Sequence, residues 1–62
     1  MFHHEGQGVL SVTGECGFIG YIWKEEGKHL FFHLEEAYNP NGATPDDLRA
    51  IADKCEELDV AE

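Results

Sequence analysis

Aromatic and histidine side chains are concentrated in one stretch of the chain, GFIGYIWKEEGKHLFFHL, which runs from Gly17 to Leu34. This stretch holds the only Trp, one of the two Tyr, three of the four Phe and two of the four His. Rings at this density fill a hydrophobic core, or they form a platform on which the bases of single-stranded nucleic acid stack. The direction in which each ring points therefore decides what this stretch can do.

Metal-binding and catalytic patterns are weak in comparison. His29 and His33 are four residues apart on a predicted strand, roughly 13 Å at the usual rise, which is too far for one metal ion. The terminal amine and His3 could chelate copper or nickel weakly, and we expect no functional metal and no cofactor. Cys16 and His33 could act as nucleophile and base. However, a cleft and an oxyanion hole are hard to build in 62 residues, so we expect no enzyme.

The elements that must position these side chains are short strands and one helix. Residues 8–12, 17–23 and 29–34 read as β-strands, because β-branched and aromatic residues alternate between glycine-containing turns. The segment KEEGK between the last two strands is a turn, in which Gly27 can adopt a positive φ. Residues 37–43 contain Asn-Pro and Asn-Gly turn signals and read as a loop.

Residues 45–58 read as an amphipathic helix. Thr44 can cap its first turn, Pro45 suits the first helical position, and acidic residues follow at the positive end of the helix dipole. An apolar stripe appears at spacings of three and four residues, formed by Leu48, Ile51, Ala52, Cys55 and Leu58. The sequence thus predicts a single small α+β domain spanning residues 1–62. In it, a three-stranded antiparallel meander is covered on one face by the C-terminal helix.

Alternation along the strands predicts which rings are buried. Pairing the richer apolar sets places one group of side chains in the core: Ile19, Tyr21, Trp23, Leu30, Phe32 and Leu34. The opposite face then carries Phe18, Phe31 and His33, with Gly20 leaving space between the rings. These three rings need a partner, which is either nucleic acid or polypeptide from the tail or a second subunit.

Charge is distributed unevenly along the chain. The formal net charge is -9, with 13 acidic and 4 basic residues, and most of the excess lies after residue 34. Proteins that bind duplex DNA usually carry a basic face, so this composition argues strongly against duplex binding. Neither a long apolar run nor a secretion signal is present. We therefore expect a cytoplasmic protein without membrane contact, in which free thiols at Cys16 and Cys55 are favoured over a disulfide bridge.

Two segments of this stretch resemble motifs of the cold-shock domain family: ECGFI at Glu15–Ile19 and LFFHL at Leu30–Leu34. The resemblance covers roughly residues 8–34, and the family's last two strands have no counterpart here. In the family these strands belong to an OB-type barrel, and their outward aromatic side chains stack single-stranded bases. The resemblance implies that Phe18, Phe31 and His33 bind single-stranded RNA or DNA. Lys24 and Lys28 at the hairpin tip would then lie close to phosphates.

The acidic helix supports an alternative function. Its carboxylates could occupy a basic site on another protein in the manner of a nucleic-acid mimic, or they could simply keep the helix face solvated. In the first case the chain is a protein-binding module that regulates or inhibits a nucleic-acid-handling partner. The contact residues would then be Asp53, Glu56, Glu57 and Asp59. Because the sheet lacks strands that would complete it, we also expect a homodimer.

Overall fold

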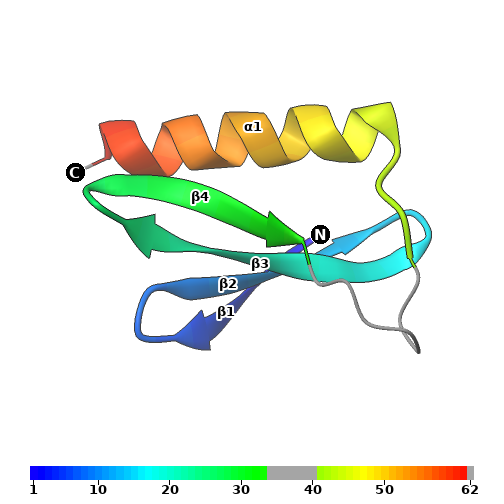
Figure 1. Ribbon diagram of the computed structural model, residues 1–62, viewed down its shortest axis with the longest axis horizontal. Coiled ribbons are helices and arrows are strands. Elements are labelled where there is room, and N and C mark those ends of the chain that lie inside the picture. Colours follow the sequence, from blue (N-terminus) through cyan, green and yellow to red (C-terminus); the bar gives the residue numbers. More distant parts are fainter. Residues whose placement is uncertain (34–40, 62) are drawn as a thin grey trace.

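The computed structural model describes residues 1–33 and 41–61, which form one antiparallel sheet and one helix. The sheet has four strands, in the order β1 (Phe2–Gly6), β2 (Val9–Gly14), β3 (Gly17–Glu25) and β4 (Lys28–His33). Helix α1 (Pro45–Val60) follows and lies against one side of the sheet (Figure 1). The α+β class predicted from the sequence is therefore confirmed.

The prediction of three strands was wrong, because Phe2–Gly6 forms a fourth strand at the edge of the sheet. The segment has few apolar residues, and four of its five residues are exposed. It is a strand because Gln7 and Gly8 turn the chain back on itself. Their φ angles are 53° and 79°, the left-handed values that a two-residue hairpin turn requires.

A similar turn joins β3 to β4. Glu26 and Gly27 have φ angles of 49° and 84°, and Glu25 pairs directly with Lys28 on either side of them. Positive φ at both central residues matches the twist of the flanking strands. The KEEGK segment is thus the turn that the sequence predicts, and it fixes the register of all pairs between β3 and β4.

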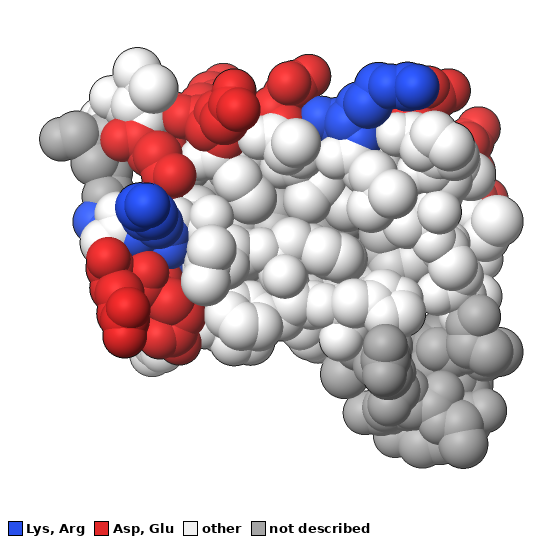
Figure 2. Space-filling model, turned by 45° about the horizontal axis from the view of Figure 1, so that its top comes forward, with Lys and Arg blue, Asp and Glu red and all other residues white. Residues whose placement is uncertain are grey.

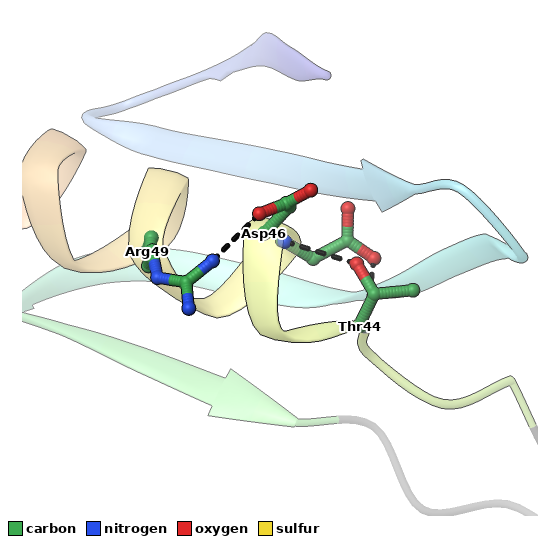
Figure 3. Close-up of polar contacts among 4 residues, drawn as sticks. Thr44, Asp46 and Arg49 are labelled. Atoms are coloured by element: carbon green, nitrogen blue, oxygen red, sulfur yellow. Dashed lines mark hydrogen bonds and ion pairs between the residues drawn. The ribbon is translucent and has the colours of Figure 1, made fainter.

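The helix begins at Thr44 and Pro45, as its sequence indicates. The Thr44 side chain accepts a hydrogen bond from the Asp47 backbone N–H at 3.1 Å, and the Asp47 carboxylate accepts one from the Thr44 N–H at 3.0 Å. This reciprocal pair satisfies two of the N–H groups that a helix start leaves without partners. One turn later, Arg49 donates to Asp46 at 2.7 Å on the exposed side (Figure 3).

Asp47 also ties the helix start to the sheet. Its side chain is only 4% exposed, and its Oδ2 accepts a further hydrogen bond from the Glu15 backbone N–H in the β2–β3 turn, at 3.3 Å. The Thr44 N–H is the main reason that the pKa of Asp47 is lowered from its ordinary value. Burial opposes this shift, while the Glu15 N–H and the Thr44 side chain add to it.

The far end of the helix is fixed to β4 through His29. Asp59 Oδ1 lies 2.8 Å from both the backbone N and the ring Nδ1 of His29. These contacts lower the pKa of the Asp59 carboxyl, the ring contact most strongly. The helix therefore lies mainly along β4, attached at its start to the β2–β3 turn and at its end to His29.

Five apolar side chains form the buried core: Leu10, Val12, Ile19, Ile22 and Ile51. Phe2, Phe31, Ala43, Cys55 and Leu58 pack around them and are partly buried. The helical stripe is confirmed only in part, since Leu48 is 51% exposed and Ala52 is also exposed. No helix among residues 1–33 and 41–61 is long and apolar enough to cross a membrane.

Candidate functional site

The two faces of the sheet are largely the reverse of those predicted from the sequence. Ile22 is fully buried under the helix and pairs with Phe31, which packs against the core. Since side chains alternate along a strand, the neighbouring residues Tyr21, Trp23 and Phe32 point to the other face. The predictions that Tyr21, Trp23, Leu30 and Phe32 form the core and that Phe31 lies outside were therefore wrong. Leu34 lies outside the described residues.

A β-bulge explains why Ile19 and Phe18 do not follow this reversal. Val12 pairs with Gly20 and Thr13 with Phe18, so Ile19 is an extra residue on β3. A bulge shifts the alternation of side chains by one position. As a result Ile19 is fully buried, as predicted, while Phe18 shares the outer face with Tyr21. Their ring centroids are 5.1 Å apart in an edge-to-face arrangement.

We call this surface the open aromatic face, defined by Phe18, Tyr21, Trp23, Leu30 and Phe32. The Trp23 and Phe32 rings are stacked, with centroids 3.8 Å apart and planes 9° from parallel. All four rings are partly exposed, and Leu30 is 44% exposed. Helix α1 covers the other side of the sheet (Figure 1), and no other described element lies against these rings.

Of the three rings predicted to bind nucleic acid, only Phe18 belongs to this face. Phe31 packs against the core, and its Cε1 would lie 2.9 Å from a Cβ placed on Gly20. Gly20 is thus covered by the Phe31 ring and leaves no open space. His33 pairs with Gly20 on β4, is exposed, and has its Nε2 3.3 Å from the Asn41 carbonyl oxygen.

The two lysines of the hairpin point to opposite sides. Lys24 pairs with His29 and lies near enough to Asp59 to contribute to the lowered pKa of that carboxyl. Lys28 pairs with Glu25 and falls on the side of Leu30 and Phe32. The prediction that both lysines serve one binding surface is therefore not supported by their positions.

Carboxylates border the open aromatic face. Glu25 Oε1 accepts a hydrogen bond from the Trp23 indole N–H at 2.9 Å, and Glu5 Oε2 accepts one from the Ser11 hydroxyl at 3.0 Å. Ser11 pairs with Tyr21, so Glu5 lies at the β1 side of the face and Glu25 at the hairpin end. Figure 2 shows other acidic side chains along α1 and an uncharged surface below it.

Of the four helix residues predicted to contact a partner, three are exposed and one binds β4. Asp53, Glu56 and Glu57 are exposed, and Glu57 lies 3.1 Å from the Lys54 ammonium. Asp59 instead binds His29, so its carboxylate holds β4 to the helix. Asp59 is for this reason a structural residue.

The described residues give little support for a cysteine-based or metal-binding site. Cys16 and Cys55 are both free thiols. Cys16 lies in the β2–β3 turn, before β3 begins at Gly17, so strand alternation does not align it with His33. Within the described part of the chain, no three His, Cys, Asp or Glu side chains are grouped closely enough to hold a metal ion.

Comparison with protein-family models, with curated proteins and with solved structures finds no match for this chain. Its function must therefore be argued from the surfaces described above. Sequence reasoning missed Tyr21, Trp23 and Phe32 as outward-facing rings. One signal could have found them: Trp23 directly precedes the charged residues Lys24 and Glu25, as expected where a strand leaves the core.

Proposed function

We propose that this chain is a small acidic protein-binding module, whose open aromatic face docks a protein partner with a basic surface. The supporting observation is a sheet face carrying four partly exposed rings and Leu30, on the side that the helix leaves uncovered. Aromatic side chains are enriched in the centres of protein interfaces. A contiguous apolar surface on a small domain commonly marks such an interface.

Charge favours a basic protein over nucleic acid as the partner. Phosphate contacts by Lys and Arg supply most of the affinity of non-specific nucleic-acid binding. At the border of the open aromatic face, Lys28 is accompanied by the carboxylates of Glu5 and Glu25. The net charge of -9 adds long-range repulsion of a polyanion and attraction of a cationic protein.

A nucleic-acid-handling protein is one class of basic partner that fits this proposal. Its cationic surface would contact the open aromatic face, and the exposed carboxylates of α1, on the other side of the sheet, would add long-range electrostatic attraction. Occupation of such a surface would regulate or inhibit the partner. In this proposal Asp53, Glu56 and Glu57 contribute charge, while Asp59 remains bound to His29.

A second candidate keeps the cold-shock resemblance and binds single-stranded RNA or DNA weakly. One observation favours it: Trp23 and Phe32 form a stacked pair on an uncovered sheet face, and base–ring stacking contributes about 1–3 kcal/mol per base. The motif-bearing strands are β3 and β4 of the meander. The stacking residues in this candidate become Phe18, Tyr21, Trp23 and Phe32.

Site-specific photo-crosslinking in an extract of the native cells separates these candidates. A benzophenone amino acid replaces the exposed Leu30 on the open aromatic face, and the control carries it at exposed Ala52 on the helix. We expect a discrete protein adduct from position 30 that is lost at high salt and absent from position 52. Trp23 fluorescence is titrated in parallel with a short pyrimidine oligonucleotide at low salt.

Three results contradict the proposal. A nuclease-sensitive adduct at position 30, together with quenching of Trp23 by the oligonucleotide, supports the second candidate instead. An adduct only between copies of this chain identifies a homodimer that buries the face. Equal adducts at positions 30 and 52 show that the open aromatic face has no specific role.

A further inference from the structure

The helix packs unevenly across the sheet and leaves a groove beside β1. It lies mainly along β4, whereas at the opposite edge a groove opens between β1 and the helix. Five residues line this groove: Phe2, Ala50, Asp53, Lys54 and Glu57. We call it the β1 groove. It lies on the helix side of the sheet, because Phe2 packs against the core, and is therefore separate from the open aromatic face.

The β1 groove already holds a cationic group of the chain itself. The Lys54 ammonium lies 5.7 Å from the centroid of the Phe2 ring and 3.1 Å from Glu57 Oε2. An ammonium at this distance is attracted by the negative face of the ring. Asp53 adds a second exposed carboxylate to the lining. The combination of a ring and two carboxylates suits an Arg or Lys side chain.

Among the residues that the structure describes, none uses the hydrogen-bonding groups at the outer edge of β1, next to this groove. β1 is the outermost strand of the described sheet. The Thr13 N–H donates to the Met1 carbonyl at 2.8 Å, which makes Met1 and Thr13 a hydrogen-bonded pair. Because such pairs alternate in antiparallel sheets, the backbone groups of Phe2 and His4 point away from β2, toward the open edge.

We propose that the edge of β1 accepts an extended basic segment of another protein by strand addition, and that the β1 groove binds one of its Arg or Lys side chains. Main-chain hydrogen bonds to Phe2 and His4 supply the affinity, as in other strand-addition complexes. Side chains of an added strand alternate between the faces of the sheet. A side chain on the helix side of that strand therefore reaches the Phe2 ring, Asp53 and Glu57.

Charge complementarity selects this occupant over a second copy of the chain. Two copies would each bring a net charge of -9 to the contact, and like charges oppose association. A basic segment instead neutralises the groove carboxylates. The β1 groove and the open aromatic face are different surfaces, so this proposal stands or fails independently of the function proposed above.

The test uses the full chain and a short, fluorescently labelled peptide in which Arg and Val alternate. The control peptide has the same sequence with every backbone nitrogen methylated, which keeps the charge but removes the N–H groups needed for strand addition. We expect the Arg-Val peptide to bind more tightly and to shift the backbone amide NMR signals of Phe2 and His4. The affinity is measured by fluorescence anisotropy at several salt concentrations.

Charge-matched variants then locate the bound side chain. Replacing both groove carboxylates, Asp53→Asn with Glu57→Gln, should weaken binding about threefold to tenfold. The control pair, Glu26→Gln with Glu56→Gln, removes the same charge outside the groove lining and should have a smaller effect. Lys54→Met removes the ammonium group from the groove and should tighten binding more than Arg49→Met, which removes the same charge from the exposed side of the helix.

Several outcomes would overturn the proposal. Equal affinity of the Arg-Val peptide and its N-methylated control excludes strand addition. Equal effects of the groove pair and the control pair, or of the Lys54 and Arg49 variants, show that only net charge matters. Peptide-induced shifts confined to Tyr21, Trp23 and Phe32 place the basic segment on the open aromatic face instead.

Discussion

Gly20→Ala is the substitution that most directly tests which side of β3 is buried. A Cβ at this position would lie 2.9 Å from Phe31 Cε1 and 3.0 Å from its Cζ, and would also clash with the Phe32 carbonyl oxygen. The Phe31 ring can shift, but the carbonyl belongs to the backbone of β4. If Gly20 instead lay on an open face with space between the rings, an added methyl group would be harmless.

The expected loss of stability follows from these contacts. Forcing one extra carbon into a packed site costs about 1–3 kcal/mol, and the backbone clash places Gly20→Ala in the upper part of that range. For a domain of this size, each kcal/mol lowers the melting temperature by about 4–8 °C. We therefore expect a decrease of roughly 10–20 °C, measured by far-UV circular dichroism and checked by urea unfolding.

Two other glycines provide matched controls. A Cβ at Gly42 would meet no atom within 4 Å, and no unusual φ opposes it, so Gly42→Ala should stay within about 0.5 kcal/mol of the wild type. Gly27 also has open space but a φ of 84°, so Gly27→Ala should cost about 1 kcal/mol through backbone strain alone. A Gly20→Ala protein as stable as Gly42→Ala would refute the assignment of the faces.

Three further predictions concern the helix and its attachments. Thr44→Ala removes the cap and should lower the free energy of unfolding by about 1 kcal/mol in urea titrations; an unchanged midpoint would contradict the capping role. The folded pKa values of Asp47 and Asp59 lie below 3.8, so the unfolded chain binds more protons in acid. The contribution of these two carboxylates to the free energy of unfolding should therefore be complete above their unfolded pKa and should be lost as the pH falls through their folded pKa values. Asp47→Asn should make this loss shallower. Cys16 is exposed, whereas burial, followed by the Asp59 charge, raises the pKa of the Cys55 thiol; iodoacetamide should alkylate Cys16 first by mass spectrometry, and equal rates would contradict this.

The helix and its first turn could be predicted from the sequence because the information is local. Thr44, Pro45 and Asp47 occupy the positions that capping requires, and they make the expected hydrogen bonds. The turn at Glu26 and Gly27 is local in the same sense. In both cases a few neighbouring residues determine the backbone, so no knowledge of distant contacts was needed.

The faces of the sheet could not be predicted in the same way, because alternation gives two faces without saying which is buried. The decision depends on contacts between distant segments: Ile51 of the helix packs with Ile22 and Val12, and Phe31 covers Gly20. Counting apolar residues chose the wrong face, since Trp23 and Tyr21 are large but end in polar groups that favour partial exposure.

The bulge at Ile19 adds a second source of error that no local pattern reveals. Val12 pairs with Gly20 and Thr13 pairs with Phe18, so Ile19 is left over on β3. This extra residue reverses the alternation of side chains between the two sides of the bulge. Phe18 and Tyr21, an odd number of residues apart, consequently share one face and make an edge-to-face contact. Phe18 belongs to the candidate site only because of this irregularity. The bulge joins Phe18 to the Trp23–Phe32 stack and so makes one continuous apolar surface from rings that regular alternation would divide between the core and the outside.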